Sequence, residues 1–255
     1  MTVMIRAAEK ASKALLRDFN EVEQLQVSRK GPADFVTAAD KRSEKILFEE
    51  LQKAKPDWSF MMEESGQVKG NEPDHVWIID PLDGTHNFMH GIPHWAISIG
   101  LERKGEIIAA LVYDCAKDEL FTAEKGGGAF LRNRRLRVSG RRDMESSMIN
   151  FGQPFGTKEQ RDRFFREQVA VNEIAMVRRY GAASLDLCYV AAGRIDGYWE
   201  RNLKPWDAAA GYLIVKEAGG TVTSIEGDDN PVYSGSLVAG NPQVHSDIRK
   251  IVKAS

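Results

Sequence analysis

Three short acidic segments are the parts of the sequence best suited to chemistry. Glu63 and Glu64 close the segment WSFMMEES, Asp80 and Asp83 close VWIIDPLDGT, and Asp207 lies in KPWDAAAG. The first two segments follow apolar runs, so their carboxylates are expected at the rim of a buried sheet. Two carboxylates three residues apart repel each other unless a cation lies between them. The pattern therefore predicts that these side chains gather around positive charge.

The type of ligand favours Mg²⁺. Carboxylate oxygens are hard ligands, and Mg²⁺ uses one or two of them per ion while keeping waters for substrate and nucleophile. Two such ions about 3.5–4 Å apart can hold both the attacking and the leaving oxygen of a phosphoryl group.

The segment DGTHNF adds a predicted anion site. If a helix starts after Asp83, its first backbone N–H groups, near Gly84 and Thr85, have no intrahelical partner and attract an anion. Gly84 also lets a phosphate approach the backbone closely. The alternative for this segment alone is a turn with a helix N-cap, and an N-cap is equally open for Asp207. Carboxylates beside an anion site indicate metal-assisted hydrolysis of a phosphate ester.

Composition places the chain among ordinary folded proteins. It has 255 residues, of which 42% are hydrophobic and 28% charged, and its net charge of −2 provides no global basic field for nucleic acid or membrane. Charges interrupt the first 20 residues, and no apolar run approaches the roughly 18–20 residues of a membrane span. We therefore expect a cytoplasmic protein with no membrane partner, in which Cys115 and Cys188 are buried free thiols.

Two halves are expected in the chain. In residues 1–144, an amphipathic helix carries Met4 and Leu15 on its buried stripe, and a second helix is capped by Thr37 with Asp40 three residues later. Short β-branched and aromatic runs follow, which predict a meander of antiparallel strands. In residues 145–255 strands and helices alternate, which predicts a second α/β layer that completes a site between the halves.

The motifs together resemble the inositol monophosphatase family over nearly the whole chain. The resemblance is carried by GPADFVTAADK, EES, WIIDPLDGTHNFMHGIP, GAASLDLCYVAAGRIDGYWE and PWDAAAGYLIVKEAGG, in that order. It implies an α+β fold, the layered αβαβα sandwich of the inositol monophosphatase and fructose-1,6-bisphosphatase type. It also implies Mg²⁺-dependent hydrolysis of a phosphate monoester, inhibition by lithium and, commonly, a homodimer.

By position, the resemblance implies a set of metal ligands. Glu64, Asp80 and the Leu82 carbonyl would bind the first ion, and Asp80, Asp83 and Asp207 the second. A third, weaker ion would rest on Glu64 and waters.

The resemblance also implies catalytic and substrate contacts. A water activated by the metal would attack phosphorus in line, oriented by Glu64 and by Thr85, which Asp40 polarises. The N–H groups of Gly84 and Thr85 would hold the phosphate, and Lys30 would lie on a loop that folds over the metals. The hydroxyls of the substrate would meet side chains and backbone at Asp83, Gly181 to Ala183, Glu200 and Asp207.

The substrate stays open within this class. Inositol 1-phosphate is favoured, and fructose 1,6-bisphosphate, histidinol phosphate and 3′-phosphoadenosine 5′-phosphate are alternatives. The basic run LRNRRLRVSGRR, residues 131–142, is interpreted as a solvated hairpin edge, with contact to RNA or a transcription complex as the alternative. A zinc face on His86, His90 and His94 is set aside, because glycine and proline interrupt that helix.

Overall fold

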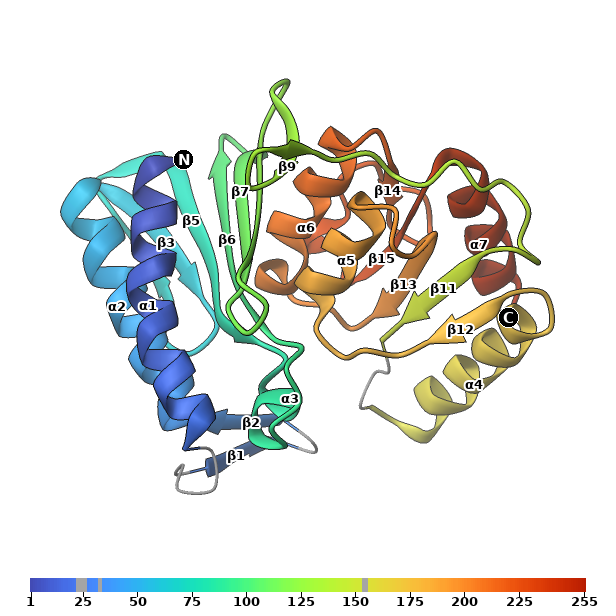
Figure 1. Cartoon of the computed structure of the whole chain (residues 1–255), viewed down its shortest axis with the longest axis horizontal. Helices are drawn as coiled ribbons and strands as arrows, with labels where there is room; N and C mark the ends of the chain where they lie inside the picture. The colour runs from blue at the N-terminus through green and yellow to red at the C-terminus, as the bar shows by residue number, and fades with distance from the viewer. Residues whose placement is uncertain (22–26, 32–33, 153–155) are drawn as a thin grey trace.

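Five layers of helices and sheets stack across the molecule in a computed structural model (Figure 1). The structure describes residues 1–21, 27–31, 34–152 and 156–255, and side chains outside 22–36 and 153–155. The order across the layers is helix, sheet, helix, sheet, helix, which confirms the predicted αβαβα sandwich. The division of the chain after residue 144 stays a prediction, and the side chain of Lys30 lies outside the described residues.

The first layer holds the two N-terminal helices, α1 (Thr2–Asn20) and α2 (Ala38–Ala54). The predicted stripe of α1 is buried, with Met4 and Leu15 fully covered. Helix α2 begins with the predicted capping box between Thr37 and Asp40. Before it, a two-stranded hairpin pairs β1 (Val27–Gly31) with β2 (Asp34–Thr37). In the described part of the chain, no helix is long and apolar enough to cross a membrane.

The second layer is an eight-stranded sheet in the order β10-β9-β8-β7-β6-β5-β3-β4. Its strands are β3 (Trp58–Met62), β4 (Gly66–Val68), β5 (Glu72–Asp83), β6 (Ala96–Arg103), β7 (Glu106–Asp114), β8 (Glu119–Glu124), β9 (Gly128–Leu131) and β10 (Arg134–Arg135). From β5 to β10 each strand pairs antiparallel with the next, as predicted.

The predicted meander is wrong at the start of the sheet, where β3 and β5 run parallel. The cause is the short strand β4, which turns back antiparallel along the outer edge of β3. The chain then enters β5 in the direction of β3 and on its other side. Apolar runs alone gave no sign of this extra reversal, because β4 has only three residues.

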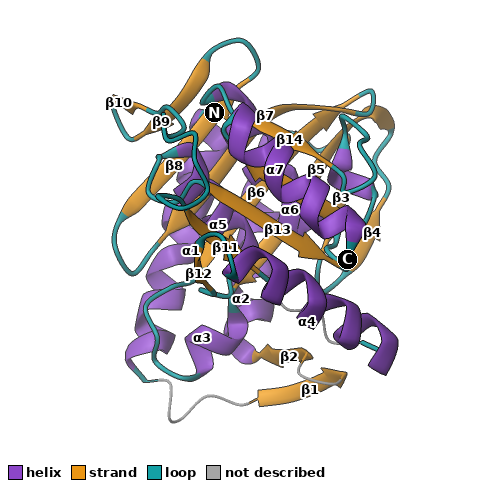
Figure 2. Ribbon diagram, turned by 90° about the vertical axis from the view of Figure 1, so that its right-hand side faces the viewer, coloured by secondary structure: helices purple, strands orange, loops and turns teal. Residues whose placement is uncertain are grey.

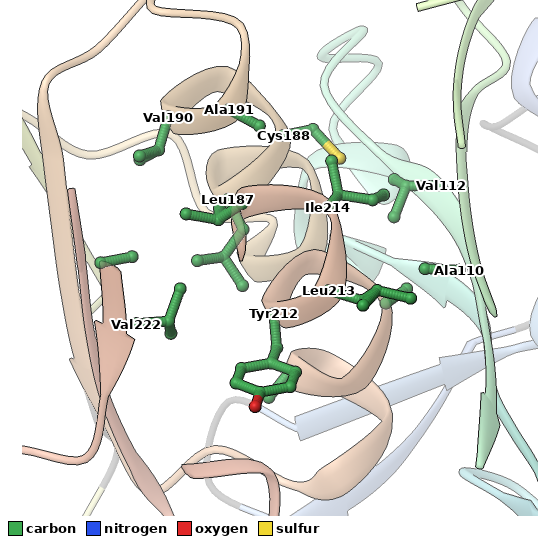
Figure 3. Packing of buried hydrophobic residues seen from close by; sticks show 14 of the residues in the cluster. Ala110, Val112, Leu187, Cys188, Val190, Ala191, Tyr212, Leu213, Ile214 and Val222 are labelled. Carbon is green, nitrogen blue, oxygen red and sulfur yellow. The ribbon is translucent and has the colours of Figure 1, made fainter. Parts of the chain in front are cut away.

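The middle layer consists of α5 (Ala183–Ala191) and α6 (Pro205–Glu217), which pack between the two sheets (Figure 3). Leu187, Cys188 and Ile214 are fully buried in this core. Both cysteines are free and buried, as expected. Helix α6 lies very close to β6, because a Cβ placed on Gly100 would lie 3.0 Å from the Cβ of Ala209. The start of α6 lies beside the end of β5, because Ser98, which pairs with Asp80, donates its hydroxyl to the Trp206 carbonyl oxygen at 3.3 Å.

The last two layers are a five-stranded sheet and its outer helices, α4 (Lys158–Asn172) and α7 (Pro242–Ala254), which face the viewer in Figure 2. The strand order is β12-β11-β13-β15-β14. The strands are β11 (Met148–Phe151), β12 (Met176–Arg178), β13 (Gly197–Arg201), β14 (Thr221–Thr223) and β15 (Ser236–Gly240). The alternation predicted after residue 145 is present.

Candidate active site

Asp80 and Asp83 face the same side of β5. Residues three apart in a regular strand point to opposite faces. Here Asp80 pairs with Ser98 and Asp83 with Ala96, so β5 carries one residue more than β6 between these pairs. Such a bulge restores the two carboxylates to one face. Proline, which cannot donate to a strand ladder, occupies position 81 within the bulge.

Glu63, and not Glu64, is the glutamate that the structure places against Asp80. The Glu63 side chain hydrogen-bonds to Asp80 and raises the pKa of the Asp80 carboxyl. Glu64 follows one residue later and lines a separate cavity of about 450 Å³ with Lys41 and Phe48. The two residues begin the turn after β3, and their side chains contact different parts of the molecule. The contact with Asp80 favours Glu63 over the predicted Glu64 as the ligand from this segment.

Asp207 joins the cluster from the first turn of α6. Pro205 opens the helix, and Asp207 Oδ2 accepts the backbone N–H of Lys204 at 2.7 Å. The capping interpretation of Asp207 thus holds. The cap is compatible with a role in the site. Burial raises the pKa of the same Asp207 carboxyl, and the negative charges of Asp83, Glu63 and Glu200 are near enough to raise it further.

The carboxylates repel one another strongly. Burial raises the pKa of Asp80 well above its usual value, and repulsion from Glu63, Asp83 and Asp207 adds to the effect. Burial likewise raises the pKa of Asp83 to about 6, against the opposing hydrogen bonds of Ser184. Because these neighbouring charges have one sign, a bound cation would favour ionisation of the whole cluster.

Thr85 and Asp40 form the predicted pair. Thr85 Oγ1 lies 3.0 Å from Asp40 Oδ1 and 3.0 Å from the Leu82 carbonyl oxygen. A hydroxyl has one proton, so it donates to one of these acceptors at a time. Asp40 is fully buried, and its second oxygen accepts the backbone N–H of Thr37 at 2.8 Å. The capping box of α2 thereby fixes the carboxylate that orients Thr85.

The predicted anion site begins at Gly84, whose φ of +89° places it in the left-handed region that glycine favours. A Cβ at this position would lie 3.0 Å from the His94 carbonyl oxygen. The helix that follows, α3 (Thr85–Met89), has only five residues. Its dipole is correspondingly small, and the backbone N–H groups at Gly84 and Thr85, where the helix opens, are the feature that suits a phosphate.

The residues expected at the substrate are only partly free for that role. Ala183 donates its N–H to Asp83 Oδ1 at 3.2 Å, so the Ala183 backbone serves a carboxylate of the site. The Asn87 amide donates to the Tyr180 carbonyl at 2.8 Å and lies 3.5 Å from that of Gly181, which ties α3 to this segment. Glu200 on β13 accepts the hydroxyl of Tyr198, and burial raises its pKa to about 8.

Mg²⁺ fits the donor set. The cluster offers carboxylate oxygens and the Leu82 carbonyl, which are hard ligands. Among the described residues no group of three or more His, Cys, Asp or Glu side chains is arranged so that it could hold a metal ion by itself. A site completed by water and substrate oxygens is typical of Mg²⁺.

Comparison with known proteins decides the family. The chain matches the inositol monophosphatase family over residues 1–255. The chain belongs to this family. It is 51% identical to an inositol-1-monophosphatase of Rhizobium meliloti, over 99% of this chain and 96% of that protein. It is 43% identical to the Nus factor SuhB of Escherichia coli, over 96% of this chain and 92% of that protein. The crystal structure of the SuhB protein of Bartonella henselae superposes with a TM-score of 0.95 at 49% identity, covering 99% and 98% of the two chains.

As a member of the inositol monophosphatase family, the protein is a phosphoric monoester hydrolase. Two of the six arginines in the basic run form ion pairs within the chain. Arg132 pairs with Asp118, and Arg141 Nε lies 2.7 Å from Asp196 Oδ1. Strand β10 ends the eight-stranded sheet, which agrees with the interpretation of a charged hairpin edge.

Four polar residues that support the site of this phosphatase were not assigned from the sequence. They are Ser43, Glu44, Asn87 and Ser184. A signal existed for the first two, since positions 40, 43 and 44 share one face of a helix. Ser184 gave none, because its partner lies 101 residues away in the sequence.

Proposed function

We propose that this phosphatase hydrolyses inositol 1-phosphate with Mg²⁺, using Glu63, Asp80, Asp83, Asp207 and the Leu82 carbonyl as ligands. The observation that carries the proposal is the position of the Thr85–Asp40 pair directly beside the like-charged cluster. When bound, Mg²⁺ supplies charge neutralisation and lowers the pKa of water. Two ions are proposed, and a third, weaker one would rest on Glu63 in place of Glu64.

The protein's own groups have separate tasks in this proposal. Thr85 donates its proton to Asp40, which leaves a lone pair on the hydroxyl oxygen to accept a proton from the attacking water. The N–H groups at Gly84 and Thr85 hold the phosphate. Glu200, Asp83 and Asp207 are placed to accept hydrogen bonds from the hydroxyls of the substrate.

Phosphate release from a panel of esters tests the proposal. Inositol 1-phosphate should be the best substrate among those considered, ahead of fructose 1,6-bisphosphate, histidinol phosphate and 3′-phosphoadenosine 5′-phosphate. Turnover should require Mg²⁺ and fall with lithium. Asp83→Asn should abolish turnover and Thr85→Ala should lower kcat by about 10²–10⁴-fold, as expected for loss of acid–base assistance. Normal hydrolysis by Asp83→Asn would contradict the metal assignment.

A role in transcription is the second candidate, and the 43% identity to the Nus factor SuhB favours it. The same variant separates the two. Asp83→Asn should leave an effect on transcription intact while it removes turnover. A homodimer and a cytoplasmic location are proposed with the family and are testable by light scattering and cell fractionation.

A further inference from the structure

Helix α2 directs three polar side chains into the protein interior. Asp40, Ser43 and Glu44 are 0%, 0% and 3% exposed. Their spacing of three and four residues puts them on one face of the helix, turned toward the end of β5 and the segment after β3. Asp40 already has a task, because it orients Thr85. Ser43 and Glu44 require an explanation of their own.

Ser43 holds the bulge of β5. Its hydroxyl donates to the carbonyl oxygen of Pro81 at 2.8 Å. Pro81 lies between Asp80 and Leu82, so this bond restrains the extra residue that brings Asp80 and Asp83 to one face. Replacing Ser43 by alanine would remove this donor from the Pro81 carbonyl oxygen. That carbonyl lies in the segment that carries most of the predicted ligands.

Glu44 holds the turn that presents Glu63. Its Oε2 accepts the backbone N–H of Glu64 at 2.8 Å, and its Oε1 accepts the hydroxyl of Ser65. The N–H of Glu64 belongs to the planar peptide unit that begins at the carbonyl of Glu63. Fixing this N–H therefore fixes the backbone from which the Glu63 side chain leaves toward Asp80.

The position of the Glu44 carboxylate is specific. Burying a charged group is costly, and although Lys41 and Lys45 line the same cavity, no ion pair between them and Glu44 is among the described contacts. Both oxygens of Glu44 instead bind one turn, and that turn contains the glutamate nearest to Asp80.

We propose that Ser43 and Glu44 are positioning residues, through which α2 sets the spacing between Glu63 and the Asp80–Asp83 pair for cation binding. Neither side chain touches the substrate or the ion. The inference rests on the proposed Mg²⁺-dependent function and adds the part of the fold that keeps the two ligand segments in register.

Mg²⁺ affinity without catalysis gives the direct test. The melting temperature of the metal-free protein is followed as Mg²⁺ is added, and the Mg²⁺ concentration at half of the full shift is compared between variants. Glu44→Ala should raise this concentration about 10–100-fold, which is the usual cost of losing an outer partner of a ligand. Glu44→Gln should recover most of the affinity, because its amide oxygen still accepts one N–H. Ser43→Ala should raise the concentration by a smaller factor.

Glu49→Ala is the matched control, since Glu49 lies on the same helix with a side chain 55% exposed. It should bind Mg²⁺ as the wild type does. A Glu44→Ala protein that is less stable yet keeps the wild-type Mg²⁺ midpoint would overturn the proposal. If Glu44→Ala does not fold, unchanged midpoints in both Glu44→Gln and Ser43→Ala would overturn it. A wild-type protein that neither responds to Mg²⁺ nor releases phosphate would instead refute the proposed function, and the positioning role with it.

Discussion

Ser184 donates both its backbone N–H and its hydroxyl to the same oxygen of Asp83, at 2.7 and 2.6 Å. Ala183 donates its N–H to the other oxygen, so the start of α5 surrounds the carboxylate of Asp83 with three donors. The backbone N–H groups at the start of α5, which have no partner within that helix, thus donate to Asp83, about 100 residues earlier in the chain. The site depends on α5 for its geometry, although α5 itself contributes none of the proposed ligands.

Ser184→Ala should weaken Mg²⁺ binding while the fold is retained. The variant loses one of the three donors, and the two backbone N–H groups still hold Asp83. We expect the Mg²⁺ concentration for half-maximal activity to rise about 10-fold, the lower end for the loss of an outer partner. Activity measured against Mg²⁺ concentration checks this. Ser146→Ala, an exposed position, is the control, and equal Mg²⁺ dependence in both variants would exclude a role for the Ser184 hydroxyl.

The stability of the metal-free protein should decrease as the pH rises. Burial raises the pKa of Glu200 from 4.5 in a free peptide to about 8 in the folded protein. Between these values the folded state binds more protons than the unfolded state, so the contribution to stability is complete below about pH 4.5 and is lost through pH 8. Asp80, Asp83 and Asp207 act in the same direction, since their pKa values are raised too.

Thermal denaturation in EDTA at pH 5.5 and pH 8.5 measures this effect. The wild type should melt several degrees lower at the higher pH, and Glu200→Gln should show a smaller decrease because one titrating group is gone. Added Mg²⁺ should reduce the decrease in both proteins. A wild-type melting temperature that rises between these two pH values would contradict the raised pKa values.

Gly152→Ala should harm substrate binding without harming Mg²⁺ binding. A Cβ placed on Gly152 would lie 1.8 Å from the carboxyl carbon of Glu200, so the end of this side chain must move. A long side chain can shift at small cost in stability, but its carboxylate then leaves the place where the substrate is proposed to bind. We expect KM to rise about 10-fold, roughly the value of one or two hydrogen bonds, with an unchanged Mg²⁺ midpoint.

Gly140→Ala is the control for this substitution, because a Cβ there meets nothing within 4 Å. If KM is unchanged in Gly152→Ala while the variant remains folded, Glu200 does not contact the substrate.

The sequence predicted those features of the fold and the site that depend on residues close together in the chain. The stripe of α1, the capping box at Thr37 and the close of a buried strand at Asp80 could all be predicted, because each depends on a few neighbouring residues. The helices and strands after residue 145 followed from periodicity in the same way. The motifs then supplied the family, which is shown by the comparison over the whole chain.

Prediction failed where the outcome depends on pairing between distant segments. The parallel contact of β3 with β5 follows from a three-residue strand at the sheet edge. The contacts of Ser184 and Glu44 join segments 101 and 20 residues apart, and no local pattern reveals them. The choice between Glu63 and Glu64 is a matter of one residue in the turn after β3, and the pairing of Met62 with Ile79 of β5 places Glu63 beside Asp80.

That choice gives the most direct test of the site. Glu63→Gln removes the carboxylate next to Asp80, so it should lower Mg²⁺ affinity and turnover by at least about 100-fold, which exceeds the usual loss of an outer partner. Glu64→Gln changes a side chain in a different cavity and leaves the backbone N–H that Glu44 accepts, so it should keep both within a few-fold of the wild type. The two variants differ from the wild type by the same atoms, one residue apart, and each is therefore the control for the other. If Glu64→Gln lowered Mg²⁺ affinity more than Glu63→Gln, the ligand would be Glu64. The turn after β3 would then have to change conformation when the cation binds.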